Sequence, residues 1–165
     1  MNSENNYKKW QQHFEKSPKL AEIKVTYKSK SRLKRKVIIL NSKESFTVLY
    51  PLFNNETIGF IEEFYMLLLN RANAVLGWVK LSTGGTTGTI IDKKIIAIIA
   101  LQMNASGIIL CHNHPSGNIK PSEIDIKITE AVNQACQLFE IKVLDHVIIS
   151  PDGTYYSFAD EGVMA

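Results

Sequence analysis

The chain has 165 residues, a length typical of one folded domain that buries roughly two thirds of the surface exposed by the unfolded chain. Hydrophobic residues make up 45% and charged residues 21%, values that exclude a disordered or fibrous protein. The longest apolar run, residues 95–101, is too short to span a bilayer, and the N-terminus lacks the apolar stretch of a signal peptide. The only two cysteines, Cys111 and Cys136, cannot form a disulfide framework. We therefore expect a cytoplasmic protein with no membrane association.

The formal net charge of +3 is unevenly distributed along the chain. Residues 1–43 carry 12 Lys and Arg against 3 acidic residues, whereas residues 44–165 carry 7 against 13. Apolar and polar residues alternate over residues 23–27, which predicts an edge strand followed by a basic loop, with its charges from Lys24 to Lys36. These charges either prevent edge-to-edge strand pairing or bind an anionic partner such as nucleic acid.

The chain is thus expected to divide into a basic N-terminal arm with an edge strand, residues 1–41, and a folded domain, residues 42–165. Ser42 can cap a helix that runs to about Phe53, and the following NNET segment forms a loop.

A hairpin follows this helix. The continuous apolar run that begins at Glu62 (EEFYMLLLN) predicts a buried strand, and residues 71–73 turn the chain into a second strand over residues 75–81. The stretch STGGTTGT, residues 82–89, lacks the Gly-Lys-Ser/Thr ending of a phosphate-binding P-loop. We interpret it as a structural loop.

The second half of the domain contains two predicted helices and three predicted strands. Asp92 caps a very apolar helix that runs to about Asn104 and must be covered nearly all round. A buried strand over residues 107–112 and a helix from Ser122 come next, and strands over 143–150 and 154–158 close the domain. The apolar face predicted for the helix after Ser122 consists of Ile124, Ile128, Ala131, Val132, Ala135, Cys136 and Phe139. This order predicts an α/β fold with a mixed sheet flanked by helices.

His112 and His114 are the most informative pair in the chain. Strand side chains alternate with period two, so both imidazoles point the same way at the end of a strand, while Cys111 points to the opposite face as a packing residue. Asp125, on the first turn of the next helix, supplies a carboxylate. Two imidazoles and one carboxylate leave a fourth tetrahedral position open, which is the arrangement of a catalytic zinc site.

Each piece also has a structural interpretation. Ser122 and Asp125 resemble a helix-capping box, and a single histidine near a strand end is usually a core or surface residue. The combination of HNHPSG with the following S-x-x-D favours a metal site. We interpret His146 as a core residue or a hydrogen-bonding partner behind the ligands, because a fourth protein ligand would close the site. The chain has no H-x-E with P-C-x-x-C, which excludes a zinc deaminase.

The same residues resemble a known family. The segment from His112 to Pro115, followed by Ser122 to Asp125, resembles the H-x-H-P and S-x-x-D signature of JAB/MPN (JAMM) metalloproteases. More narrowly, HNHPSG, PSEID and VLDHVIIS resemble the RadC family, and the likeness covers residues 62–158. The resemblance implies a JAB/MPN fold, similar to cytidine-deaminase-like folds.

This resemblance also implies roles for two further residues. Glu62, in an E-x-F pattern with Phe64, corresponds to the general base of the family, and its neighbour Glu63 points to the opposite face by strand alternation. Ser122 corresponds to the residue that stabilises the oxyanion. The implied activity is zinc-dependent hydrolysis of an amide in a peptide or protein. The alternative is a DNA-associated repair or mobile-element factor that binds nucleic acid through the basic arm.

Overall fold

The computed structural model describes residue 8 and residues 37–84 and 91–164. The chain divides into two units, Met1–Arg32 and Leu33–Ala165. The second unit contains α2 (Ser42–Leu49), the 3-10 helix η1 (Tyr50–Leu52), β1 (Glu63–Leu69), β2 (Val75–Thr83), α3 (Lys93–Gln102), β3 (Gly107–Asn113), α4 (Glu123–Gln137), β4 (Lys142–Ile149) and β5 (Tyr155–Ser157).

Some predicted features fall beyond this part of the chain. The expected edge strand over residues 23–27, the charges from Lys24 to Lys36, and residues 85–90 of the glycine-rich loop all lie outside the described residues. Within the described residues, no helix is long and apolar enough to cross a membrane.

The strands form one mixed sheet in the order β2-β1-β3-β4-β5. β3 and β4 run parallel and are connected through α4, while the other neighbouring pairs are antiparallel. The hairpin of β1 and β2 closes through a turn in which Asn70 Oδ1 accepts from the backbone N–H of Ala72 and Ala74, and Asn73 adopts a left-handed φ of 53°. The predicted mixed sheet and hairpin are therefore confirmed.

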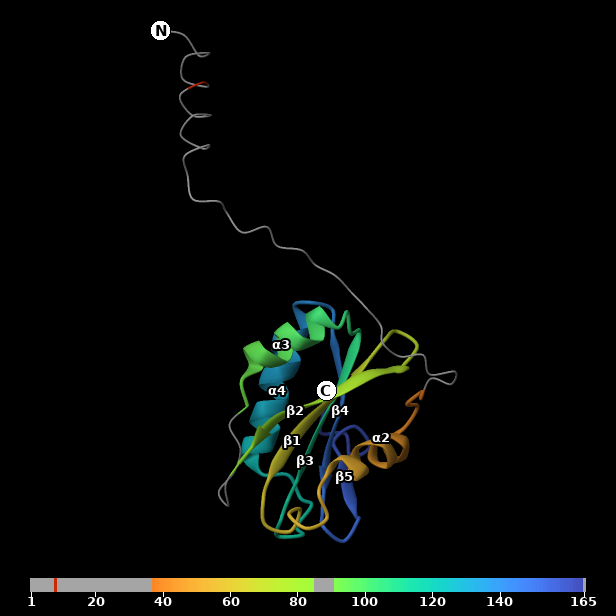
Figure 1. Cartoon of the computed structure of the whole chain (residues 1–165), viewed down its shortest axis with the longest axis vertical. Coiled ribbons are helices and arrows are strands. Elements are labelled where there is room, and N and C mark those ends of the chain that lie inside the picture. Colours follow the sequence, from red (N-terminus) through yellow and green to blue (C-terminus); the bar gives the residue numbers. More distant parts are fainter. Residues whose placement is uncertain (1–7, 9–36, 85–90, 165) are drawn as a thin grey trace. The chain divides into compact units, whose positions relative to one another are not determined.

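Helices cover both faces of this sheet (Figure 1). On one face, Ile96 of α3 and Val132 of α4 pack against apolar residues of β1 and β3. On the other face, Leu49 of α2 packs against Leu67 and Ile109. Every residue of β1 and β3 is buried, which explains why both central strands are apolar almost throughout.

The N-cap of the first helix, α2, lies one residue earlier in the chain than predicted. Asn41, not Ser42, is the N-cap, and its side chain accepts from the backbone N–H of Glu44 at 2.9 Å. The α-helix ends at Leu49 instead of Phe53, since Pro51 lacks the N–H needed to continue it and the chain tightens into η1.

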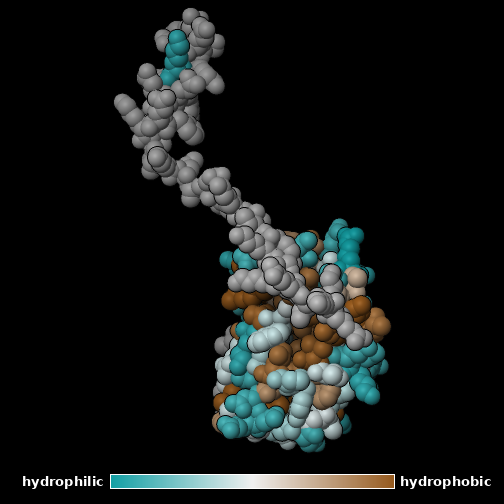
Figure 2. All heavy atoms as spheres, turned by 45° about the vertical axis from the view of Figure 1, so that its right-hand side comes forward, coloured by the Kyte–Doolittle hydropathy of each residue, from teal (hydrophilic) through white to brown (hydrophobic). Residues whose placement is uncertain are grey.

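α3 is not covered all round, so that expectation is wrong. Ile96 and Ala100 are fully buried, but Ile95, Ile98 and Leu101 are 49%, 43% and 48% exposed. Only one stripe of the helix contacts the sheet, and apolar composition alone does not reveal which stripe. Apolar side chains also reach the surface on the face seen in Figure 2.

The buried face of α4 is rotated relative to the predicted one. Val132 and Cys136 are fully buried, which confirms the packing role of Cys136, but Ile124 is 67% exposed. Phe139, beyond the helix, is 48% exposed. Instead, the polar residues Asp125 and Thr129 occupy the inner face of the first turns. The rotation brings Asp125 to the histidines.

Candidate metal centre

His112 and His114 lie at the end of β3, on the face of the sheet that α4 covers. His112 pairs with Phe64 of β1 and is buried, whereas His114 follows the strand and is half-buried. The backbone N–H of His114 donates to the carbonyl of Ile149 at 2.9 Å, which ties this segment to β4. The two Nε2 atoms lie 2.9 Å apart, as strand alternation predicts. Cys111 is buried in the apolar core of the opposite face, which confirms its packing role.

Asp125 brings a carboxylate to these imidazoles from the first turn of α4. Its Oδ1 atom lies 3.2 Å from His112 Nε2, and its Oδ2 atom lies 3.5 Å from His114 Nε2. One potential ligand atom from each of the three residues lies within 4.8 Å of the others. The residues predicted to bind a metal thus converge on one point, where they could hold a metal ion.

The spacing of these atoms fits a zinc ion. Ligand atoms about 2.0–2.1 Å from one zinc ion in a tetrahedron lie roughly 3.3 Å from each other. The two Nε2 atoms lie 2.9 Å apart and His112 Nε2 lies 3.2 Å from Asp125 Oδ1, both close to that value, while the other carboxylate oxygen, Oδ2, lies 3.5 Å from His114 Nε2. Two imidazole nitrogens and one carboxylate oxygen are also a donor set that zinc prefers.

The charges around the point favour a cation. His114 Nδ1 lies 2.6 Å from the carbonyl oxygen of Asn118, which can only accept, so Nδ1 carries the proton and Nε2 of the neutral ring presents a lone pair. Burial opposes ionisation of Asp125, but the neighbouring His112 and His114 imidazoles and the Ser122 hydroxyl hold its pKa well below its usual range. Burial likewise disfavours charge on His114, yet Asp125 and the Asn118 carbonyl outweigh it and raise the pKa of His114. A proton or a metal ion between the imidazole Nε2 atoms and the Asp125 carboxylate therefore stabilises this arrangement.

His146 lies behind His112 and away from the point of convergence. Its Nε2 atom is 2.8 Å from Nδ1 of His112, the ring nitrogen that faces away from Asp125. The ring is fully buried against Phe64 and Phe158, and burial holds its pKa well below the usual value. The interpretation of His146 as a core residue is confirmed, and its hydrogen-bonding partner is His112.

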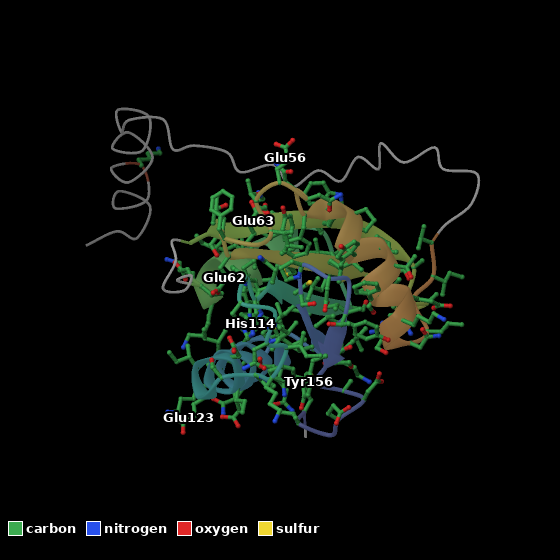
Figure 3. All side chains as sticks on the ribbon, turned by 90° about the horizontal axis from the view of Figure 1, so that it is seen from below. Glu56, Glu62, Glu63, His114, Glu123 and Tyr156 are labelled. Atoms are coloured by element: carbon green, nitrogen blue, oxygen red, sulfur yellow. The ribbon has the colours of Figure 1, made fainter. Side chains whose placement is uncertain are left out.

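The two neighbouring glutamates have different surroundings. Glu63 is buried, and its carboxylate binds Lys80 Nζ and accepts from Tyr65 Oη on the face opposite the histidines. Glu62 is half-buried and lies near enough to His114 to raise the pKa of that imidazole. Figure 3 shows Glu62 nearer than Glu63 to His114. The structure therefore places Glu62, the residue chosen as general base, on the side of the candidate metal site.

Ser122 is the N-cap of α4 and forms a complete capping box with Asp125. Its hydroxyl donates to Asp125 Oδ2 at 2.6 Å, while its oxygen accepts from the backbone N–H of Asp125 at 3.2 Å. Both interpretations of the S-x-x-D segment therefore describe the same carboxylate: Oδ2 caps the helix and Oδ1 faces His112. To donate to a substrate oxyanion, the Ser122 hydroxyl has to leave Asp125.

Asn113 is a site residue that the sequence analysis missed. It is fully buried between the two histidines in sequence. Its Oδ1 accepts from the backbone N–H of Glu63 at 2.8 Å, and its Nδ2 donates to the carbonyls of Ile58 and Ile61 at 2.7 and 2.8 Å. These bonds fix the segment that carries Glu62 beside the end of β3. The sequence signal that could have identified Asn113 is its side-chain amide at the end of a mostly apolar strand, where a buried polar group needs hydrogen-bond partners.

This geometry defines a class of domain: a mixed α/β sheet with a His-His-Asp group shared between a central strand and the helix that follows it. The model of the family described as "RadC-like JAB domain" matches residues 37–163. The chain belongs to this family, as the resemblance of its motifs predicts. The JAB superfamily includes metalloproteases.

The relatives carry a family designation without a stated activity. A "UPF0758 protein" of Flavobacterium johnsoniae is 43% identical over 127 residues, which cover 76% of this chain and 53% of that protein. One from Porphyromonas gingivalis is 46% identical over 103 residues, covering 62% of this chain and 45% of the relative. "UPF0758 protein YfjY" of Escherichia coli is 41% identical over 103 residues, covering 62% and 64%. The chain spans about half the length of the first two.

Proposed function

We propose that this chain is a zinc-dependent hydrolase that cleaves an amide bond, either peptide or isopeptide, in a peptide or protein substrate. The convergence of His112, His114 and Asp125 on one point carries the proposal. The side chains of His114 and Asp125 are 17% and 12% exposed, so solvent and substrate can approach from their side. Membership of a superfamily that includes metalloproteases supports the choice of an amide substrate.

The protein side of the proposed chemistry begins with the three ligands. His112 and His114 would hold the ion through Nε2 and Asp125 through a carboxylate oxygen. A zinc ion held there would supply Lewis acidity, which would lower the pKa of a bound water to about 7 and polarise a carbonyl. Asp125 and the two neutral imidazoles set the charge at this point and leave one side open.

Glu62 is the proposed general base. Its carboxylate takes a proton from the attacking water and later delivers one to the departing amide nitrogen. Its location beside His114, fixed through the Asn113 hydrogen bonds to the preceding loop, supports this role. Ser122, once its hydroxyl turns from Asp125, is the proposed donor to the oxyanion of the tetrahedral intermediate.

The Glu62→Gln variant tests this proposal. A screen of peptides, isopeptide-linked proteins and nucleic acids should find an amide substrate whose turnover falls about 10²–10⁴-fold in the variant, because Gln cannot accept the proton. Zinc content should stay at the wild-type level, since Glu62 is not a proposed ligand.

Glu63→Gln is the matched control. Its side chain lies on the opposite face of β1, so the folded variant should turn over substrate at close to the wild-type rate. Equal losses in both variants, or wild-type turnover in Glu62→Gln, would contradict the assignment of Glu62.

A second candidate function follows from the charge distribution. The excess of basic residues in the first 43 positions favours contact with phosphates, although the stretch from Lys24 to Lys36 lies outside the described residues. If this arm binds nucleic acid, affinity should fall steeply with added salt and be abolished by reversing its charges in the full-length chain. Affinity that is unchanged by salt would rule this function out.

A further inference from the structure

A chain of hydrogen bonds behind His112 begins at the backbone of α4. Thr129 Oγ1 lies 2.6 Å from the carbonyl oxygen of Asp125, one turn earlier in the helix. A carbonyl has no proton to give, so the hydroxyl proton of Thr129 is committed to this bond. Thr129 is buried, which leaves its oxygen lone pairs directed at protein neighbours.

The next contact is to His146. Its Nδ1 atom lies 2.6 Å from Thr129 Oγ1, and since the only hydroxyl proton is used elsewhere, Nδ1 must carry the proton of this bond. A fully buried imidazole packed against Phe64 and Phe158 is neutral, because a charge there would be desolvated without a carboxylate partner. His146 Nε2 therefore presents a lone pair.

That lone pair faces His112 Nδ1 at 2.8 Å. The bond requires a proton on His112 Nδ1, which leaves Nε2 of His112 with its lone pair directed at Asp125 and His114. We propose that Thr129 and His146 are positioning residues that fix His112 in its Nδ1–H tautomer, so that Nε2, not Nδ1, is the ring nitrogen available to a metal ion. The inference rests on the proposed metal site, since a ligand nitrogen must be free of its proton.

The second histidine provides an internal comparison. His114 Nδ1 donates to the backbone carbonyl of Asn118, which is independent of Thr129 and His146. The two ligands therefore have separate tautomer controls, one through side chains and one through backbone. A change at Thr129 should alter His112 and leave His114 as it is.

Thr129→Val tests the proposal with a side chain of nearly the same shape. Without the hydroxyl, His146 is no longer held in its Nδ1–H form and can adopt the Nε2–H form. His146 Nε2–H then donates to His112 Nδ1, so His112 carries its own proton on Nε2 instead of Nδ1. Nitrogen-15 spectra of the metal-free, full-length protein should show His112 gaining Nε2–H population, with His114 unchanged. Zinc affinity, measured by competition with a chromophoric chelator, should fall about 10–100-fold. Thr129→Ser, which keeps the hydroxyl, should retain both the tautomer and the affinity.

A second pair of variants, at His146, tests the proposal independently if Thr129→Val does not fold. Gln at position 146 offers both an acceptor for His112 and a donor for Thr129, so His146→Gln should bind zinc more tightly than His146→Leu by about 10-fold or more. A folded Thr129→Val protein with the wild-type His112 tautomer, or equal affinities in the Gln and Leu variants, would overturn the proposal. If the wild-type chain takes up no zinc, the proposed function fails, whereas the metal-free spectra still decide the tautomer control.

Discussion

At the scale of single residues, each polar group at the end of β3 serves more than one neighbour. Asp125 caps α4 with one oxygen and faces His112 with the other. Asn113 joins β3 to the loop before β1 through three hydrogen bonds. The candidate site and the local fold therefore depend on the same side chains, and a substitution there changes both.

Asn113→Ala should be among the most destabilising single substitutions that leave the apolar core intact. It leaves the N–H of Glu63 and the carbonyls of Ile58 and Ile61 without their partner in a buried place, at a cost of about 2–4 kcal/mol in the free energy of unfolding. Denaturant unfolding of the metal-free protein measures this. Asn118→Ala, in an exposed loop, should cost under about 1 kcal/mol, and similar losses in the two variants would contradict this account.

At the scale of elements, short-range patterns predicted most of the helices and strands. Period-two alternation placed His112 and His114 on one side of β3, and the Asp92 cap marks the start of α3 as expected. The patterns failed where the contact partner decides which side of a helix is buried. KKIIAIIALQ is apolar around its whole circumference, so its sequence cannot say which stripe meets the sheet.

The two sides of α3 offer a matched test of that finding. Ile96→Ala removes a fully buried side chain and should lower the free energy of unfolding by about 2–5 kcal/mol. Ile98→Ala, at a position that is 43% exposed, should lower it by less than about 1 kcal/mol. Chemical denaturation of both variants checks the prediction. Equal losses would mean that a further surface covers Ile98.

At the scale of the whole molecule, the fold class and the family could be predicted, whereas the detailed geometry could not. The order of strands and helices identified a mixed α/β sheet, and the spacing of HNHPSG to S-x-x-D pointed to the RadC-like JAB family. The closer likeness to cytidine-deaminase-like folds stays a prediction. The hydrogen-bond partners of Asn113 and the contact between Thr129 and His146 could not be predicted, because these residues lie on different elements and only tertiary packing brings them together.

The account depends on the ability of His112, His114 and Asp125 to bind zinc, and a zinc titration of the metal-free chain tests it most directly. The wild-type protein should take up about one zinc ion per chain, and Asp125→Asn, which keeps an oxygen to cap α4 but loses the charge, should bind zinc at least about 100-fold more weakly while remaining folded. A wild-type chain that binds no zinc, or an Asp125→Asn chain that binds it as tightly, would contradict the account.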